Sequence, residues 1–469
     1  MDIGAVTLTD LAARLRAGEL SPREATQGYL DRIERLNPTV NAFLTVDAER
    51  ALAAADAAEA TPAAERGPLW GVPLGIKDVV DVGGLTTTCA SNVLRDAPPA
   101  PRDSTTVAKL RAAGAIILGK VNTHEFALGA WTDSKAFGPA RNPWDTERIC
   151  GGSSGGSGCT MAAGLAAGTL GTDTAGSIRI PACFGGVTGI RPSTGRVSNG
   201  GSVPVSATFD TIGPIARTAE DCALLLRTIA GYDPERDPST FDLPVPDYVA
   251  GLGGGVKGLR IGVVAQRLES GVDPAVAAAV RAAIEELRGL GALVEEVRPV
   301  FTETAGVVHQ LVMLPEAAQN HARWLRECPE KYGADVRARL LAGVFMPGPA
   351  YATGQKARRV AFDEARELFR RFDLLVQPQM PVTPPKLGQV EVDLGPSGQL
   401  PYRLALLPFN SPWSLVGLPA MSVPAGLVGG LPVGMVIVGP RFGEQQVLRA
   451  GHAFQQATDW HTKRPALAI

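Results

Sequence analysis

The sequence predicts a layered α/β fold, and two observations carry this prediction. Amphipathic helical stretches alternate along the chain with short apolar runs that are typical of buried strands. Residues 149–204 are rich in glycine, serine and threonine but also carry many apolar side chains, so we expect them in the interior and not in a linker. With 469 residues, of which 45% are hydrophobic and 20% charged, the chain can build a sizeable core.

The N-terminal elements follow from local signals. Ser21-Pro22-Arg23-Glu24 combines an N-cap serine, a proline at the first helical position and a glutamate, so we expect a helix there that ends near Arg35, before Asn37-Pro38. An alanine-rich helix is expected at 47–60 and an apolar strand-like run at 71–80. Residues 105–119 predict a helix followed by a buried strand at 115–118.

The rest of the chain continues the alternation. Helical periodicity is present at 276–287 and 362–372, and apolar strand-like runs occur at 259–264, 294–300, 374–378, 418–424 and 432–439. Residues 232–257 are loop-like. We interpret them as an insertion within one large domain and not as a domain boundary.

The charge balance argues against two classes of partner. Lys and Arg total 45 against 47 Asp and Glu, a net charge of −2, so there is no basic surplus for nucleic acid or an anionic membrane. Neither nucleic acid nor a membrane is therefore an expected partner, which leaves a small-molecule substrate, and a homodimer is a reasonable expectation. The N-terminus lacks a signal-peptide pattern and no apolar run reaches 18 residues, so we expect a soluble cytoplasmic protein.

The cysteines do not suggest a disulfide framework or a metal site. Six are scattered without a CxxC pair, which indicates buried or idle thiols (Cys89, Cys150, Cys159, Cys183, Cys222 and Cys328).

Two glycine–serine segments carry the strongest chemical signal. They are Gly151-Gly-Ser153-Ser154-Gly-Gly-Ser157-Gly158 and Gly171-Thr-Asp173-Thr-Ala-Gly176-Ser177-Ile-Arg179-Ile-Pro181. Tight turns of small residues expose backbone N–H groups, which bind a phosphate or a developing oxyanion. No lysine follows the glycines as in a P-loop and no G-x-G-x-x-G occurs in this stretch, so an oxyanion is favoured over a phosphate.

A serine nucleophile needs a base, and the five histidines do not offer one in a known catalytic context. A buried lysine is the alternative, because desolvation disfavours its charged form. Lys77 follows an apolar run and precedes Val79-Val80. The residues alone leave open a second interpretation, in which Lys77 ends a strand and reaches solvent beside Asp78.

The order of these segments resembles the amidase signature family. The Lys77 segment (71–78) and the two glycine–serine segments match its motifs, with further matches at 120–127, 138–143 and 431–439. The resemblance runs from about residue 5 to 465, and the 24-residue spacing of Ser153 and Ser177 is the family's. It implies one domain over 1–469, with a mixed β-sheet flanked by helices and a signature core at about 65–220.

The resemblance also implies a Ser-Ser-Lys triad. Ser177 would be the nucleophile that forms the acyl-enzyme, and a neutral Lys77 would be the terminal base. Ser153, whose peptide bond is cis in that family, would lie between them and relay the proton. The remaining implied roles are an oxyanion hole of backbone N–H groups (Thr174, Ala175, Gly176 and Ser177) and loop support (Asp173, Arg179 and Ser154). No metal or organic cofactor is implied. Two departures are Ala175, where glycine is common, and Cys150, which we interpret as an inert buried thiol.

Two functions fit this resemblance. The main prediction is a stand-alone amidase that cleaves a small carboxamide to a carboxylate and ammonia or an amine. The alternative is the A subunit of a glutamyl-tRNA amidotransferase, which releases ammonia from glutamine for a partner; that class usually has glutamine where this chain has Ile180. A catalytically inactive binding protein is disfavoured, because Lys77, Ser153 and Ser177 are all present.

Several residues outside the motifs are named only as candidates. Those expected near the substrate pocket are Trp131, Phe137, His309, Met313, Phe409 and Trp413. His124-Glu125 is interpreted as a buried hydrogen-bonded structural pair and not as a second acid/base pair.

Overall fold

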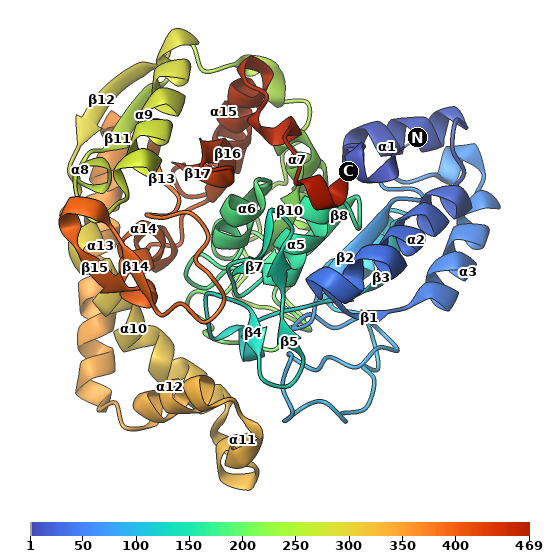
Figure 1. Ribbon diagram of the computed structural model, residues 1–469, viewed down its shortest axis with the longest axis horizontal. Helices are drawn as coiled ribbons and strands as arrows, with labels where there is room; N and C mark the ends of the chain where they lie inside the picture. The colour runs from blue at the N-terminus through green and yellow to red at the C-terminus, as the bar shows by residue number, and fades with distance from the viewer. Residues whose placement is uncertain (1) are drawn as a thin grey trace.

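One sheet of 11 strands runs through the protein (Figure 1), as seen in a computed structural model that describes residues 2–469. The strands follow the order β1 (Phe43–Val46), β3 (Ile116–Val121), β2 (Pro73–Lys77), β8 (Gly168–Thr172), β10 (Ile212–Ala216), β9 (Thr188–Arg191), β16 (Ala420–Val428), β17 (Leu431–Val438), β13 (Leu374–Pro378), β11 (Arg260–Val264) and β12 (Leu293–Val297). β2 is parallel to β3 and β8, and β11 is parallel to β12 and β13, whereas the other neighbours are antiparallel. The predicted mixed sheet is therefore confirmed.

Helices flank this sheet. They are α1 (Leu8–Ala17), α2 (Pro22–Val40), α3 (Ala48–Glu59), α4 (Thr105–Ala112), α5 (Gly155–Ala163), α6 (Arg179–Gly185), α7 (Ala219–Ile229), α8 (Gln266–Glu269), α9 (Pro274–Gly289), α10 (Phe301–Asn320), α11 (Ala322–Glu327), α12 (Ala334–Val344), α13 (Gly348–Arg371), α14 (Tyr402–Leu415) and α15 (Glu444–Ala457). Three two-stranded ribbons pair β4 (Asp133–Ser134) with β5 (Gly138–Pro139), β6 (Arg141–Asn142) with β7 (Asp145–Ile149), and β14 (Glu391–Asp393) with β15 (Gln399–Pro401). α10, α11 and α12 extend to the lower left in Figure 1.

Two predicted helix boundaries were wrong. α2 does not end before Asn37-Pro38 but continues to Val40, because only its last turn contains the proline and the buried Leu36 and Val40 continue its apolar face. The left-handed Asn41 then ends the helix and donates its N–H to Asn37 O at 2.8 Å. α13 begins at Gly348, well before the predicted residue 362, because its first turns consist largely of small residues, glycine and proline among them, which give no apolar period.

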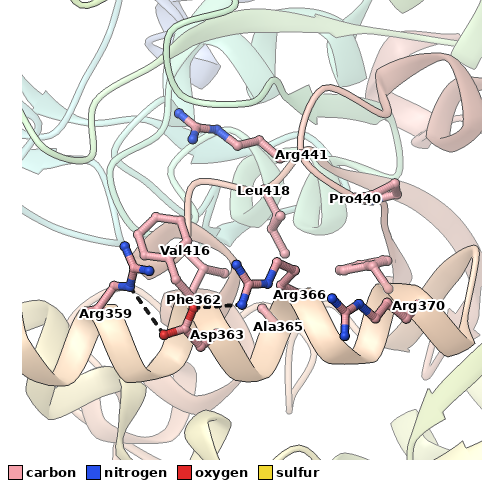
Figure 2. Close-up of a pocket in the computed structure, with 11 residues that line it drawn as sticks. Arg359, Phe362, Asp363, Ala365, Arg366, Arg370, Val416, Leu418, Pro440 and Arg441 are labelled. Carbon is pink, nitrogen blue, oxygen red and sulfur yellow. Dashed lines mark hydrogen bonds and ion pairs between the residues drawn. The ribbon is translucent and has the colours of Figure 1, made fainter.

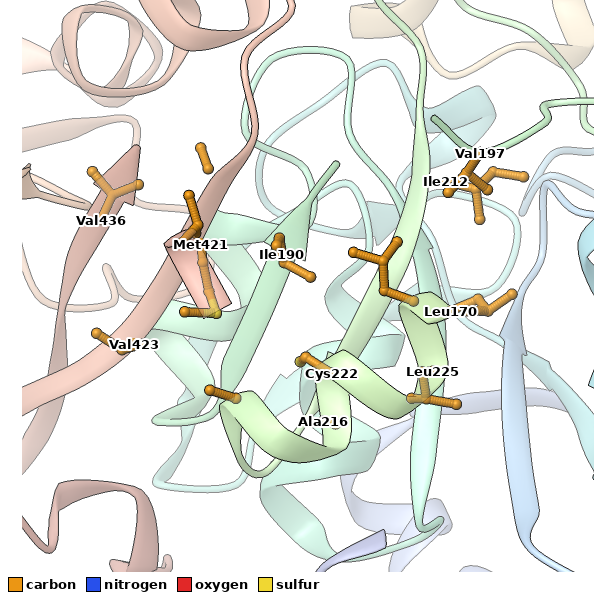
Figure 3. Packing of buried hydrophobic residues seen from close by; sticks show 14 of the residues in the cluster. Leu170, Ile190, Val197, Ile212, Ala216, Cys222, Leu225, Met421, Val423 and Val436 are labelled. Carbon is orange, nitrogen blue, oxygen red and sulfur yellow. The ribbon is translucent and has the colours of Figure 1, made fainter. Parts of the chain in front are cut away.

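The core forms where the two parallel sections of the sheet are joined by antiparallel strands. Leu170 of β8, Ile190 of β9 and Met421 of β16 are almost completely buried, in one cluster with Cys222 and Leu225 of α7 (Figure 3). The glycine–serine region lies inside as predicted, since most of residues 149–204 are buried.

The two ends of the described chain meet at one place. Arg464 Nη1 lies 2.7 Å from Asp2 Oδ2, and Arg32 donates both to Asp2 Oδ1 at 2.9 Å and to Ala468 O at 2.9 Å. Figure 1 shows N and C side by side. Residues 231–251 form no helix or strand, and a short 3-10 turn at Leu252–Gly254 follows them. None of the helices in residues 2–469 is long and apolar enough to cross a membrane.

Candidate active site

Two parallel strands place the candidate base. Lys77 is the last residue of β2, and β2 pairs with β8 so that Ile76 lies opposite Leu170. The carboxyl ends of parallel strands open at the same edge of a sheet, which is where α/β proteins build their sites. Thr172, the last residue of β8, therefore lies beside Lys77, and its Oγ1 accepts a hydrogen bond from Lys77 Nζ at 2.7 Å.

Lys77 is completely buried and has only hydroxyl partners. Its Nζ donates to Ser153 Oγ at 2.7 Å as well as to Thr172, and it forms no ion pair within residues 2–469. Burial lowers the pKa of Lys77 from 10.5 to about 7, although the more distant carboxylates of Asp173 and Asp210 act in the opposite direction. The interpretation in which Lys77 reaches solvent is therefore wrong, and the amine can be neutral near pH 7.

Ser153 and Ser177 come from two turns that precede short helices. Ser153 is buried directly before α5, and the Gly152–Ser153 peptide bond is cis, as the resemblance implied. Ser177 precedes α6 and is only half-buried, so its side chain can be reached from outside. Ser154 N–H donates to Ser177 O at 3.2 Å and holds the turns together. Within residues 2–469 no hydrogen bond joins the two hydroxyls directly.

The Asp173 carboxylate organises the loop before Ser177. It accepts hydrogen bonds from Gly176 N–H at 2.6 Å and from Arg179 Nε at 3.0 Å, and it lies 3.4 Å from Arg191 Nη1. Burial alone would raise the pKa of Asp173, but the guanidinium groups of Arg179 and Arg191 hold it well below its usual range. The carboxylate is thus a fixed anion that shapes the loop.

This arrangement limits which of the predicted oxyanion donors have a free N–H group. Gly176 N–H points to Asp173, so we do not count it among the free donors, whereas the N–H groups of Thr174, Ala175 and Ser177 have no hydrogen-bond partner among residues 2–469. Gly176 is required for another reason. Its φ is +113°, and a Cβ there would lie 2.4 Å from Asn410 Oδ1.

The carbonyl side of the same loop is held by His309 of α10. His309 Nε2 lies 2.9 Å from Thr174 O, and because a carbonyl only accepts, Nε2 must carry the proton. Burial lowers the pKa of His309 to about 4, so the ring is neutral, and it stacks on Phe209 at 4.2 Å between centroids. Thr174 Oγ1 donates to Asp210 Oδ1 at 2.6 Å, so the loop is fixed from two sides.

A small cavity of about 50 Å³ opens above Ser177. Of the residues expected near the substrate pocket, Trp131 and Met313 line this cavity. His309 instead supports the loop before Ser177, and Phe137 does not line the cavity. Phe409 and Trp413 are buried in the core. Sequence reasoning missed the other side chains on the wall (Leu128, Ile180, Gln310, Arg339, Arg403, Leu406 and Leu407). Most of these come from α10, α12 and α14, where no motif signals them.

The other residues singled out in the motifs are structural. Ser154 Oγ donates to Thr172 O at 3.1 Å and Ser157 Oγ donates to Leu170 O at 3.0 Å, so both tie α5 to β8. Cys150 is buried and burial raises the pKa of its thiol, which keeps it inert. Glu125 accepts from Ser91 Oγ at 2.5 Å and from Gly333 N–H at 2.8 Å, as expected for a structural side chain.

A larger cavity of about 560 Å³ lies elsewhere, along α13 (Figure 2). Two of its arginines are paired, since Arg359 and Arg366 lie 3.2 and 3.4 Å from Asp363. None of the residues that line the cavity at Ser177 lines this larger cavity, so the volume of a cavity does not by itself identify the candidate active site.

Comparisons with known proteins identify the family of this chain. The family model described as Amidase matches residues 24–448. The A subunit of glutamyl-tRNA(Gln) amidotransferase from Roseiflexus sp. (strain RS-1) is 43% identical, covering 99% of each chain. A structure from a vestigial protein complex linked to the origins of an s-triazine catabolic enzyme is 34% identical with a TM-score of 0.92, covering 96% of this chain and 98% of that one. Native peptide amidase from Stenotrophomonas maltophilia is 30% identical with a TM-score of 0.85, covering 98% of each.

The first of these relatives contradicts the expected partners. The expected partners were a small-molecule amide alone and no nucleic acid, but the Roseiflexus protein is named as one subunit of an enzyme for glutamyl-tRNA(Gln). The expectation that the amide is the only partner and that nucleic acid plays no part is therefore wrong. The physical reason is that net charge describes the whole surface, whereas one subunit can leave contacts with nucleic acid to its partners or to a local patch.

Proposed function

Because this chain belongs to the amidase family, we propose that it hydrolyses a carboxamide through an acyl-enzyme on Ser177, as the subunit of an amidotransferase that releases ammonia from glutamine. One observation carries the chemistry. A completely buried lysine without a carboxylate partner is hydrogen-bonded to Ser153, directly beside the loop that presents Ser177. The subunit role is supported by the 43% identity to an amidotransferase A subunit over 99% of each chain.

The proposed reaction begins with a proton relay. Neutral Lys77 Nζ takes the proton of Ser153 Oγ, which in turn takes the proton of Ser177 Oγ as that oxygen attacks the amide carbon. The carbonyl oxygen becomes an oxyanion in front of the N–H groups of Thr174, Ala175 and Ser177. Losing one such donor typically costs about 10²–10³ in rate.

The relay then runs in the opposite direction. Protonated Lys77 returns a proton through Ser153 to the leaving nitrogen, the C–N bond breaks and ammonia leaves, so that the acyl group remains on Ser177. Water attacks the ester while the same relay accepts its proton, and the carboxylate is released. A lysine with a pKa near 7 suits both directions, because it can accept and donate a proton near neutral pH.

A second candidate is hydrolysis of an amide other than glutamine. The observation that favours it is the wall of the cavity, which offers no Asp or Glu side chain among the described residues to receive the ammonium group of glutamine. Ile180 on this wall is apolar. The 30% identity to a peptide amidase over almost its whole length is consistent with this candidate.

Ammonia release from a panel of primary amides that includes glutamine tests both candidates. Wild type, Ser177→Ala and a control, Ser270→Ala at an exposed serine, are compared at equal concentration. Release from glutamine alone would support the amidotransferase role, and release from other amides would support the second candidate. Ammonia release that survives Ser177→Ala would contradict the proposed nucleophile.

A further inference from the structure

The larger cavity along α13 combines an apolar floor with a basic rim, and we call it the α13 groove. Its apolar side chains come from α13, from the segment between α14 and β16, and from the segment after β17 (Phe362, Ala365, Phe369, Val416, Leu418 and Pro440). Its rim carries one carboxylate, that of Asp363, against four arginines (Arg359, Arg366, Arg370 and Arg441). In a chain with a net charge of −2, this is a local concentration of positive charge beside apolar surface.

The residues of α13 that line the groove have the spacing of a helix that packs against another helix. Steps of three, four and three residues separate the arginines and phenylalanines of this face, as at the a and d positions of a helical seam (Arg359, Phe362, Arg366 and Phe369). Both phenylalanines are only partly buried, whereas Ala361 and Leu368 on the neighbouring face are buried. The opposite wall of the groove belongs to no helix or strand, so within residues 2–469 this seam has no helical partner.

The positive charge of the rim is not neutralised within the described chain. Asp363 lies 3.2 Å from Arg359 and 3.4 Å from Arg366, so one carboxylate serves two guanidinium groups. Both arginine side chains are largely exposed, and exposed ion pairs contribute little. Arg441 has no ion-pair partner among residues 2–469, and its guanidinium group lies over the Phe241 ring, 4.7 Å from its centre. Figure 2 shows the arginines of α13 on the side that faces the opposite wall.

Arg358 holds the two walls of the groove together. Its Nε donates to Leu415 O at 2.8 Å, at the end of α14 and directly before Val416 of the opposite wall. Its guanidinium group also lies 4.9 Å from the centre of the Phe362 ring. The apolar floor is therefore preformed, which reduces the entropy lost when a partner docks on it.

The length and chemistry of the groove select the class of ligand. Arg359 and Arg370 are 11 residues apart, or about 16 Å along the helix axis, which is too long for one small anion. A phosphate backbone would pair with the arginines but would leave the apolar floor without apolar contacts and would meet the carboxylate of Asp363. An amphipathic helix satisfies both parts, with apolar side chains on the floor and carboxylates at the rim.

We propose that the α13 groove is the docking site for an acidic amphipathic helix of a partner protein. The apolar stripe of that helix packs on Phe362 and Phe369. Its Asp and Glu side chains pair with Arg359, Arg366 and Arg441. The inference goes beyond the proposed function and does not depend on it, because no residue lines both the groove and the cavity at Ser177.

A synthetic peptide of about 18 residues probes the groove. It carries leucine at a and d positions and glutamate at e and g positions, which keeps it from pairing with itself. A matched peptide has lysine in place of every glutamate, and a second has alanine in place of every leucine. Fluorescence anisotropy should show that the first peptide binds the protein more tightly than either matched peptide, by about tenfold or more. Failure of the first peptide to bind, or equal binding of the three, would overturn the inference.

Charge reversal on α13 places the binding in the groove. Arg359→Glu combined with Arg366→Glu should weaken binding of the glutamate peptide by about tenfold or more and should strengthen binding of the lysine peptide. Arg323→Glu combined with Arg288→Glu is the matched control, because it changes the net charge equally at exposed arginines that are also paired within their own helices. Circular dichroism checks that both double variants fold. Equal effects of the two double variants would overturn the assignment to the groove.

Two further measurements separate the other occupants. A single-stranded RNA of similar length is titrated in the same buffer, and tighter binding of RNA than of the glutamate peptide, lost in the α13 double variant, would overturn the inference in favour of nucleic acid. Analytical ultracentrifugation compares wild type with this variant. A wild-type dimer that the variant converts to a monomer would make a second copy of the chain the occupant and would equally overturn it. Sedimentation that the variant leaves unchanged supports a different protein as the partner.

Discussion

β2 and β3 lie side by side, and each carries a completely buried lysine with a different set of partners. Lys77 at the end of β2 contacts only the hydroxyls of Ser153 and Thr172, both at 2.7 Å. Lys120 on β3 lies 2.9 Å from Asp78 Oδ1 and donates to Thr87 Oγ1 at 2.9 Å. The two environments differ by one carboxylate.

That carboxylate separates the proposed catalytic lysine from the structural one. A buried ammonium group is tolerated when an opposite charge compensates its desolvation, and Asp78 supplies this charge to Lys120. Hydroxyl groups supply hydrogen bonds but no charge, so burial lowers the pKa of Lys77 and favours its neutral form, which the proposed role as a base requires. Asp78 directly follows Lys77 in the sequence yet serves the neighbouring strand, since alternate residues of a strand point to opposite faces.

Removing the amine of Lys77 should have the largest effect on the reaction. Lys77→Met keeps the length of the side chain but not the base, so we expect kcat/KM to fall by about 10²–10⁴-fold. Steady-state ammonia release measures this. Lys120→Met is the comparison variant: a similar loss of activity with intact folding would mean that the two lysines do not differ as described.

Breaking the ion pair on β3 should mainly affect stability. Asp78→Asn leaves Lys120 buried without a compensating charge, and it weakens the contact with Thr88, so we expect a loss of about 3–5 kcal/mol in the free energy of unfolding. Urea unfolding followed by circular dichroism measures it. The double variant Asp78→Leu with Lys120→Met should recover part of the loss, and no recovery would indicate that packing rather than charge is responsible.

The pH dependence should report the neutral amine of Lys77. Its pKa in the folded protein is about 7, so kcat/KM should rise as pH increases through 7 and then level off. Between pH 7 and 10.5 the unfolded chain binds a proton at this lysine that the native chain does not, so wild-type stability should rise with pH across that window relative to Lys77→Met. A pH profile that is flat from 6 to 9 would contradict this assignment.

The hydroxyl partner of Lys77 should have the smallest effect. Thr172 Oγ1 accepts a hydrogen bond from Lys77 Nζ, which favours the charged amine, so Thr172→Val should shift the rising limb of the pH profile to lower pH by less than about one unit. Thr87→Val removes the equivalent hydroxyl beside Lys120 and serves as the matched control. A shift of the profile in Thr87→Val, or a shift to higher pH in Thr172→Val, would not agree with the comparison.

Local patterns were sufficient for most elements of the fold. The strand at 374–378, the helix at 47–60 and the buried glycine–serine region are present as predicted. The predicted helix boundaries were wrong where a local signal opposes packing, as at Pro38, or where the first turns of a helix are built of small residues, as at the start of α13. The order of the triad motifs also led to the right family.

By itself, the sequence determined the α/β alternation, the family and the segments that supply Lys77, Ser153 and Ser177, because strand and turn signals and short motifs are local. Only the tertiary structure decided that the buried Lys77 has no carboxylate partner whereas Lys120 pairs with Asp78. It also decided that Asp173 accepts the hydrogen bond of Gly176 N–H, and that Arg339 and Arg403 line the same cavity beside Ser177. These features depend on contacts between segments far apart in the chain. Desolvation and charge pairing arise from all neighbours in space, and no sequence period records them.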